Sequence, residues 1–373
     1  DITSAQLAGL VLIGERKIRP IDWETVKYPF PLPKPNNKDE FEDQDLLDYI
    51  LNKEKTVHPF FKEFFGYFRG KDTRDFNDDK KIKLGQPITH MAKMNMPYYR
   101  DGKPIDAYIR FSTGGAHGST CAGLHKMSPS EIETWIRQDV GTGTQKENRF
   151  TVDKTGVIHA DFASFYPVMA SKMRIYETEE GIDRYSPMIT HRKEVKHKAE
   201  KLKENDLTHT AEYLELQSLQ LAFKLILNAT TGAGNMHRPN TALPLDNKTF
   251  SMRLIGNMLI WVLGQRLVDA GAFVISTNTD GLFVTGITKD EAKTVIDNYI
   301  ADYGMPVDPE YVTRFINATT STRIEFDHHE DVPSRAGGTL GHAIDLKFSP
   351  FSLGRNVSIP LISGNAVLDY MAN

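Results

Sequence analysis

The feature that most constrains the fold is a hairpin pattern in the second half of the chain. Two apolar runs, residues 272–277 and 282–285, are joined by Asn278-Thr-Asp-Gly281. An Asp-Gly pair between alternating runs is a strong indicator of a tight turn between antiparallel strands. The sequence therefore predicts part of an antiparallel sheet here.

Helical patterns surround this hairpin. Residues 250–269 form a strongly periodic apolar helix that ends at Gly271. Residues 186–203 and 211–229 indicate two helices joined by a short polar stretch. A capping-box pattern after the hairpin predicts one more helix, beginning near Thr288 and ending about fifteen residues later.

Further β-like runs flank these helices, at residues 157–162 and 322–327, and Pro167 suits the first turn of a helix after the earlier run. The order is strand, helical hairpin, long helix, β-hairpin, helix, strand. This order predicts an α+β fold with an antiparallel sheet and a helical insertion, and it excludes a regular doubly wound series. A chain of 373 residues has room for about two or three domains.

Composition excludes several classes of protein. Apolar residues make up 40% and charged residues 25%, which argues against a disordered or fibrous chain. The single cysteine, Cys121, excludes an internal disulfide framework and a multi-cysteine zinc site. The net charge is −4, so any nucleic-acid-binding surface has to be a local basic patch. Since no apolar run approaches the ~18 residues of a membrane span, no membrane partner is expected.

Proline and glycine mark three other stretches. Residues 28–35 hold four prolines, which indicates an extended linker before a helical piece at residues 45–52. A last helical piece is expected at residues 365–372. Residues 114–118 hold three glycines, which allow either a tight turn or a very close approach of the backbone to another group.

Two acidic residues occupy strand ends, and each has a purely structural alternative. Asp161 could cap the following helix, and Asp280 could simply suit its turn. If the two strands are neighbours, carboxylates ~4 Å apart repel by roughly 4 kcal/mol at an effective dielectric near 20. Such a pair needs a shared proton or a divalent cation, and oxygen-only ligands at the open end of a sheet suit Mg²⁺.

The predicted helical hairpin supplies positive charge. Residues 191–203 hold six lysines and arginines against two glutamates, although such a helix can also be a solvated face. In residues 221–228 the polar positions are Lys224 and Asn228, which share one helix face, and Gln217 extends that face. A lysine inside an apolar run is costly unless an anion meets it, so we expect anion binding here.

Four segments, in this order, resemble motifs of the family B DNA polymerases. Ser112-Thr-Gly-Gly115 is similar to the Y-x-G-G segment before the palm, and Asp161-Phe-Ala-Ser-Phe-Tyr-Pro167 resembles the first palm motif, D-x-x-S-L-Y-P. Residues 224–232 resemble the fingers motif, K-x-x-x-N-S-x-Y-G, and residues 278–281 resemble the second palm motif, D-T-D-S. The short spacings are most similar to bacteriophage members.

This resemblance implies a polymerase palm with an antiparallel sheet, helical-hairpin fingers and a reduced thumb. The implied parts are an N-terminal or template-side segment at 1–99, palm at 100–185 and 230–330, fingers at 186–229, and a thumb-like segment at 331–373. The implied reaction adds dNMP to a primer 3′-hydroxyl with two Mg²⁺ ions, for which Mn²⁺ could substitute. The implied partners are primer–template DNA and dNTPs, in the cytoplasm of a host cell.

The resemblance also implies roles for individual residues. The catalytic carboxylates would be Asp161 and Asp280, and the metal ligands would be these two side chains with the carbonyl of Phe162. The residues that contact the nucleotide would be Ser164, Phe165, Tyr166, Arg192, Lys224 and Asn228, with Tyr166 excluding a 2′-hydroxyl. The residues that contact DNA would be Gly114, Gly115, Gly232 and Lys347.

Three positions depart from the family motifs, because Asn278, Thr231 and Ser112 stand where the motifs have Asp, Tyr and Tyr. The first two departures favour an alternative, a degenerate polymerase that only binds DNA or a replication partner. A primase-polymerase or a reverse transcriptase is another alternative, against which Tyr166 and the absence of a Tyr-x-Asp-Asp turn argue. Residues 21–25 imitate an exonuclease motif, but too few residues follow for such a domain, so any proofreading is expected in another segment or in other replication proteins.

Overall fold

The computed structural model describes residues 95–112, 115–119, 128, 130, 144–146, 149–177, 181–233, 248–317, 322–326 and 333–337. The proline-rich stretch, the helical pieces expected at 45–52 and 365–372, Gly114 and Lys347 lie outside these residues. The chain divides into two compact units. In the described part, the first unit holds residues 163–256 and 301–306, and the second holds the remainder.

The second unit is built on one antiparallel sheet, in agreement with the predicted α+β class. Its strands are β1 (Asn95–Arg100), β2 (Lys103–Ser112), β3 (Gly115–Ser119), β4 (Thr144–Lys146), β5 (Arg149–Phe162), β6 (Phe273–Asn278), β7 (Gly281–Thr285), β8 (Val307–Asn317), β9 (Arg323–Phe326) and β10 (Arg335–Gly337). Among the described residues they pair in the order β1-β2-β3-β6-β7-β5-β8-β9-β10, and β4 pairs with β5. The predicted hairpin is therefore flanked by β3 and β5.

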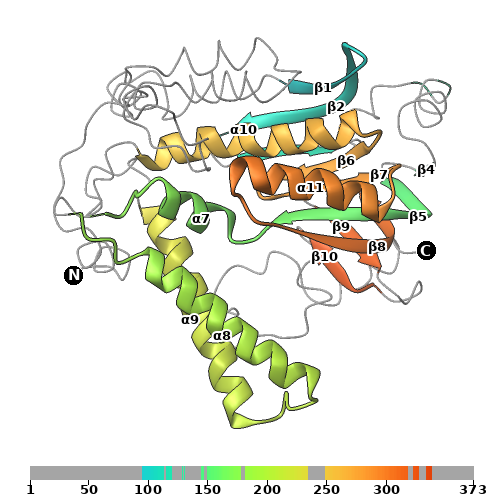
Figure 1. Cartoon of the computed structure of the whole chain (residues 1–373). Coiled ribbons are helices and arrows are strands. Elements are labelled where there is room, and N and C mark those ends of the chain that lie inside the picture. The colour runs from blue at the N-terminus through green and yellow to red at the C-terminus, as the bar shows by residue number, and fades with distance from the viewer. Residues whose placement is uncertain are drawn as a thin grey trace, which may run out of the picture. The chain divides into compact units, whose positions relative to one another are not determined.

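Two helices pack on this sheet, α10 (Lys248–Asp269) and α11 (Lys289–Tyr303). Trp261 of α10 is fully buried and stacks on Tyr98 of β1, with 6.1 Å between ring centroids. Tyr299 of α11 meets Phe162 of β5 edge-on at 5.9 Å. In Figure 1 both helices run across the same face of the sheet, so the opposite face is the one they leave uncovered.

Alternation along β5 decides which side chains reach the face opposite α10 and α11. Successive strand residues point to opposite faces, so Asp161 points away from the helix that Phe162 contacts. β5 is longer than the predicted run at 157–162, because an irregularity between Asp153 and Val157 breaks the alternating pattern. β8 was not predicted at all, although it is the direct neighbour of β5.

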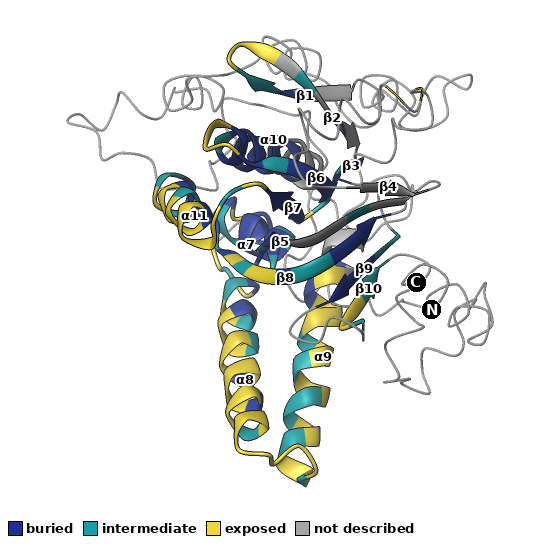
Figure 2. Ribbon diagram, turned by 90° about the vertical axis from the view of Figure 1, so that its right-hand side faces the viewer, coloured by how far each residue is buried: buried dark blue, intermediate teal, exposed yellow. Residues whose placement is uncertain are grey.

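The first unit contains α7 (Phe165–Lys172), α8 (Ser186–Glu204) and α9 (Ala211–Ala233). α8 and α9 pack along each other as the predicted helical hairpin, and α7 packs on both. The Tyr185 hydroxyl donates to the Leu227 carbonyl at 3.1 Å, and His191 meets Phe223 edge-on at 5.2 Å. Most other side chains of the hairpin are exposed (Figure 2).

Two local expectations can be compared directly with the helix ends. Thr288 and Glu291 form the predicted capping box, in which the Thr288 N–H donates to the Glu291 carboxylate at 2.8 Å. In contrast, α9 continues to Ala233, past the predicted helix end at residue 229, so Gly232 lies inside the helix. No helix in the described part of the chain is long and apolar enough to span a membrane.

Candidate functional site

The two strand-end carboxylates lie on adjacent strands of the second unit. Asp161 of β5 pairs with Gly281 of β7, which directly follows Asp280 at the hairpin tip. The Phe162 N–H donates to the Asp280 carbonyl at 2.7 Å. The order of the strands therefore brings together two acidic residues that are far apart in the sequence.

The surroundings of this pair make ionisation unfavourable. Asp161 is half-buried, and burial raises the pKa of its carboxyl to about 6. Nearby Asp280, Glu310 and Asp308 raise this pKa further, whereas His159 opposes them. Asp280 is exposed overall. Its carboxyl group is nevertheless partly shielded from water, and this shielding raises its pKa as well. A cation or a proton would stabilise such a pair.

Two further carboxylates near Asp161 come from β8, and sequence reasoning missed both. Asp308 is the β8 partner of Asp161, and Glu310 is the β8 partner of His159. Because β8 was not predicted, no pattern in the sequence connected these residues with Asp161. Acidic residues alternate with uncharged ones in residues 307–310, but this pattern is too short to predict a strand or its neighbour in the sheet.

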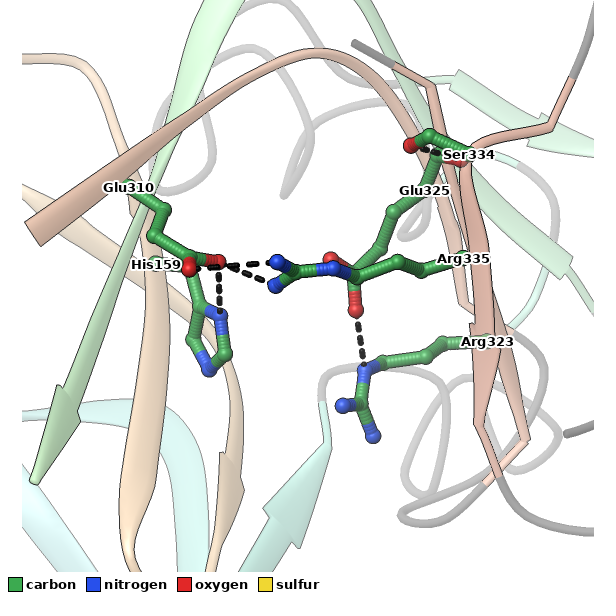
Figure 3. Close-up of polar contacts among 6 residues, drawn as sticks. All are labelled: His159, Glu310, Arg323, Glu325, Ser334 and Arg335. Carbon is green, nitrogen blue, oxygen red and sulfur yellow. Dashed lines mark hydrogen bonds and ion pairs between the residues drawn. The ribbon is translucent and has the colours of Figure 1, made fainter. Parts of the chain in front are cut away.

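Glu310 is held by two basic groups (Figure 3). One oxygen lies 3.6 Å from His159 Nδ1, and Arg335 of β10 donates to both oxygens, with 3.2 Å for the Nη2 contact. The pKa of Glu310 is lowered to about 2, first by His159 and then by Arg335. Beside them, Arg323 pairs with the buried Glu325 at 2.8 Å. The acidic residues of this face are therefore partly balanced by basic ones.

His159 and Asp161 both pack closely against Gly281. A Cβ at this position would lie 2.9 Å from His159 Nε2 and 3.1 Å from Asp161 Oδ1. The His159 ring stacks on Phe283, with 4.0 Å between centroids and 8° between planes. The absence of a side chain at position 281 is thus required by its neighbours in the sheet.

The glycine-rich segment is a strand whose close approach is to the hairpin turn. Gly115 has φ +125°, and a Cβ there would lie 2.6 Å from Thr279 Cγ2. Thr279, itself at φ 44°, donates its N–H to the Ala116 carbonyl at 2.7 Å. His117 Nε2 lies 3.0 Å from Thr279 Oγ1. Ser112 of β2 pairs with Gly115 of β3, so the chain reverses direction here as the tight-turn alternative predicts, and Gly115 approaches Thr279 as well. The DNA contact of Gly115 stays a prediction.

Asp161 and Asp280 are the side chains here that could hold a divalent cation. Within the described ranges, no group of three or more His, Cys, Asp and Glu side chains is arranged to hold a metal ion. Two neighbouring carboxylates with raised pKa values fit an oxygen-binding ion such as Mg²⁺, which needs only one or two protein carboxylates. The ligand role of the Phe162 carbonyl stays a prediction.

In the first unit, Ser164 and Arg192 form one polar cluster. Ser164 precedes α7 in a left-handed conformation, with φ 56°, which is uncommon for a residue other than glycine. Arg192 Nη1 donates to Ser164 Oγ at 2.7 Å, and burial lowers the pKa of the guanidinium. Its Nε–H is buried without a partner among the described residues. A buried donor of this kind is suited to an acceptor from a ligand.

Lys224 and Asn228 are both exposed on α9. The sequence argument treated Lys224 as a lysine in an apolar environment, and this is wrong, because Leu221 and Leu225 beside it are exposed too. Lys224 is solvated, so its placement alone does not demand an anion. Tyr166, the predicted sugar contact, is half-buried with its ring 5.3 Å from that of Phe165.

Comparison with known proteins gives only a weak structural likeness. No protein-family model matches the chain, and no curated protein matches it. Among solved structures, the chain is similar to the family B DNA polymerase of the hyperthermophilic archaeon Pyrobaculum calidifontis, with a TM-score of 0.35 and 15% identity. The match covers 59% of this chain and 32% of that polymerase, so the chain spans about a third of its length.

Proposed function

We propose that this chain is a template-directed DNA polymerase that joins a dNMP to a primer 3′-hydroxyl and releases pyrophosphate. The observation that carries the proposal is the approach of Asp161 and Asp280 at neighbouring strand ends, where both carboxyl pKa values are raised. The order of the four motifs along the sequence adds support. The proposed parts are a palm built on the sheet, fingers formed by α8 and α9, and a reduced thumb.

Asp161, Asp280 and the carbonyl of Phe162 would hold two Mg²⁺ ions, with Mn²⁺ as a possible substitute. These ions would activate the attacking hydroxyl and neutralise the leaving pyrophosphate. The protein's own contribution is to fix the two carboxylates at neighbouring strand ends, where neither has an arginine or lysine as a permanent ion-pair partner among the described residues.

Side chains of the first unit would bind the nucleotide. Arg192, whose buried Nε–H lacks a partner in the described part, and the exposed Lys224 would bind the triphosphate. The backbone N–H groups around Ser164 and Phe165 would hold its β- and γ-phosphates. Tyr166 would lie under the sugar and exclude a 2′-hydroxyl, and Asn228 would border the new base pair. DNA contacts would come from Gly114, Gly115, Gly232 and Lys347.

Primer extension tests this function. We expect the wild-type chain to extend a primer on a DNA template with dNTPs and Mg²⁺, and Asp161→Asn or Asp280→Asn to lower the rate at least a thousandfold. Asp297→Asn is the matched control, because Asp297 is an exposed carboxylate on α11 that pairs with Lys293. This control should extend primers at the wild-type rate.

The alternatives give different results in the same assay. Binding of primer–template DNA without extension at any Mg²⁺ or Mn²⁺ concentration would contradict the proposal and favour a degenerate polymerase. Extension with rNTPs as efficient as with dNTPs would favour a primase-polymerase. Equal rates for the wild type and both active-site variants would show that the activity belongs to a contaminant.

A further inference from the structure

His159 is a buried polar side chain beside Asp161 to which the proposed reaction gives no role. The two residues are two positions apart on β5 and therefore point to the same face of the sheet. The imidazole stacks nearly parallel on Phe283 of β7, with 4.0 Å between centroids. On its other side, Nδ1 lies 3.6 Å from a carboxylate oxygen of Glu310 on β8.

Glu310 is itself fixed. Arg335 of β10 donates to both of its carboxylate oxygens, in a fork that leaves the carboxylate little freedom to rotate (Figure 3). The ring of His159 therefore stacks on Phe283 and faces a Glu310 carboxylate that Arg335 fixes, although its Nδ1 makes no hydrogen bond among the described residues. This arrangement leaves Nε2 beside Gly281, at the same point that Asp161 Oδ1 approaches.

The geometry around Gly281 links this ring to Asp161. A Cβ added there would lie 2.9 Å from His159 Nε2, closer than real Cβ atoms come to other heavy atoms, and 3.1 Å from Asp161 Oδ1. Either the His159 ring or the Asp161 carboxylate would have to move. Because the imidazole is buried and stacked on Phe283, whereas Asp161 is half-buried, we expect the carboxylate of Asp161 to yield.

We propose that His159 is a positioning residue for Asp161, and that it acts as a fixed wedge for which the missing side chain of Gly281 makes room. The catalytic consequence rests on the proposed function, since Asp161 is the carboxylate assigned to the metal ions. The steric coupling between positions 159 and 281 does not rest on it.

A double-mutant cycle of Gly281→Ala and His159→Ala tests the proposal. Gly281→Ala adds only the Cβ, at a position without a positive φ. In the wild-type background it should lower kcat at least tenfold and raise the Mg²⁺ concentration for half-maximal rate. The KM for dNTP and the Kd for primer–template DNA should stay within twofold. In the His159→Ala background, the same substitution should change kcat by less than twofold, because the ring that forces the carboxylate aside is gone.

Substitutions of Arg335 provide a second test of the proposal. Arg335→Met should lower kcat and raise the Mg²⁺ requirement, because the Glu310 carboxylate that faces the imidazole is then no longer fixed. Arg335→Lys keeps the charge and should restore most of the loss. His197→Ala, which removes an exposed histidine from α8, is the matched control and should leave kcat and the Mg²⁺ requirement unchanged.

Melting temperatures of the same four proteins separate this inference from the proposed function. Gly281→Ala should lower the melting temperature by several degrees with His159 present and by clearly less without it. If the four melting temperatures show this coupling but the wild-type chain extends no primer, the polymerase proposal fails and the steric role of His159 stands. If primers are extended but the losses in kcat and in melting temperature are additive, the wedge is overturned. A Gly281→Ala protein with wild-type kcat, Mg²⁺ requirement and melting temperature would overturn it too.

Discussion

At Asp161 the fold places a carboxylate where ionisation is unfavourable. The group is half-buried and close to Asp280, Asp308 and Glu310, and its pKa is raised to about 6. A protein that needed this residue only for stability would be better served by a neutral side chain of similar shape. The retention of negative charge at such a position is typical of functional sites, where environment and role are matched.

A pH-dependent gain in stability is expected for Asp161→Asn. The folded-state pKa of Asp161 is above its unfolded value, so stability is full below the unfolded value near 3.8 and is lost as pH rises toward 6. Asparagine cannot ionise and avoids this loss. After a discount for partial exposure we expect a gain of about 1 kcal/mol at pH 7.5, or about 2–4 °C in melting temperature, and almost none at pH 4.

Scanning calorimetry in EDTA at both pH values measures this difference, and EDTA removes any stabilisation by divalent ions. Asp297→Asn, which changes an exposed carboxylate, serves as the control and should show no such gain at pH 7.5. An Asp161→Asn protein that melts at or below the wild-type temperature at pH 7.5 would contradict the expectation that ionised Asp161 lowers the stability of the fold.

At the level of elements, β3 supports the turn of the β6–β7 hairpin. Gly115, Ala116 and His117 contact Thr279, the residue before Asp280, through packing, a backbone hydrogen bond and a side-chain contact. Thr279 needs this support because a β-branched residue at positive φ is strained. The glycine-rich strand thus helps to define where Asp280 stands.

Gly115→Ala should therefore damage the hairpin. The new Cβ would meet Thr279 at 2.6 Å and would adopt φ +125°, so we expect a loss of about 1–3 kcal/mol in the free energy of unfolding and at least a tenfold loss in primer extension. Gly102→Ala is the matched control, since Gly102 has φ +74° but nothing within 4 Å of its Cβ position. The measurements are urea unfolding, extension rate and DNA affinity.

The two interpretations of Gly115 differ in which quantity changes. If the glycine acts through Thr279, kcat and stability fall in Gly115→Ala while DNA affinity is kept. If it only approaches DNA, the affinity falls and the unfolding free energy matches that of Gly102→Ala. The second result would contradict the role of β3 as a support for the hairpin.

The helical hairpin α8–α9 offers a test that is free of stability effects. Lys224 is exposed, so Lys224→Ala should leave the melting temperature unchanged. If this lysine binds the triphosphate, the KM for dNTP should rise about tenfold, since a charge-assisted contact contributes about 1.5–3 kcal/mol. Lys198→Ala, an exposed lysine on α8, is the control. An unchanged KM in Lys224→Ala would remove this residue from the proposed nucleotide contacts.

For the whole molecule, the net charge of −4 hides a division of charge between the two units. The second unit gathers three carboxylates around Asp161 and offsets them only partly with His159 and Arg335. The first unit holds the basic helix α8 and the half-buried Arg192. The proposed reaction, with metal ions and a triphosphate, would need both kinds of surface, which a net charge cannot reveal.

The sequence alone determined the elements whose signals are local. The Asp-Gly turn, the capping box at Thr288 and the helical periodicities predicted β6–β7, α8, α9, α10 and α11 to within a few residues, because each depends on contacts between residues close in the chain. The position of Asp161 and Asp280 at strand ends was predicted too.

Only the tertiary structure decided which residues surround these carboxylates. Asp308 and Glu310 reach Asp161 through the pairing of β8 with β5, and Gly281 accommodates His159 through the pairing of β7 with β5. The exposure of Lys224 likewise depends on what packs against α9 and not on its neighbours in the sequence. Strand register and packing join residues far apart in the chain, and no short pattern in the sequence encodes such a pairing.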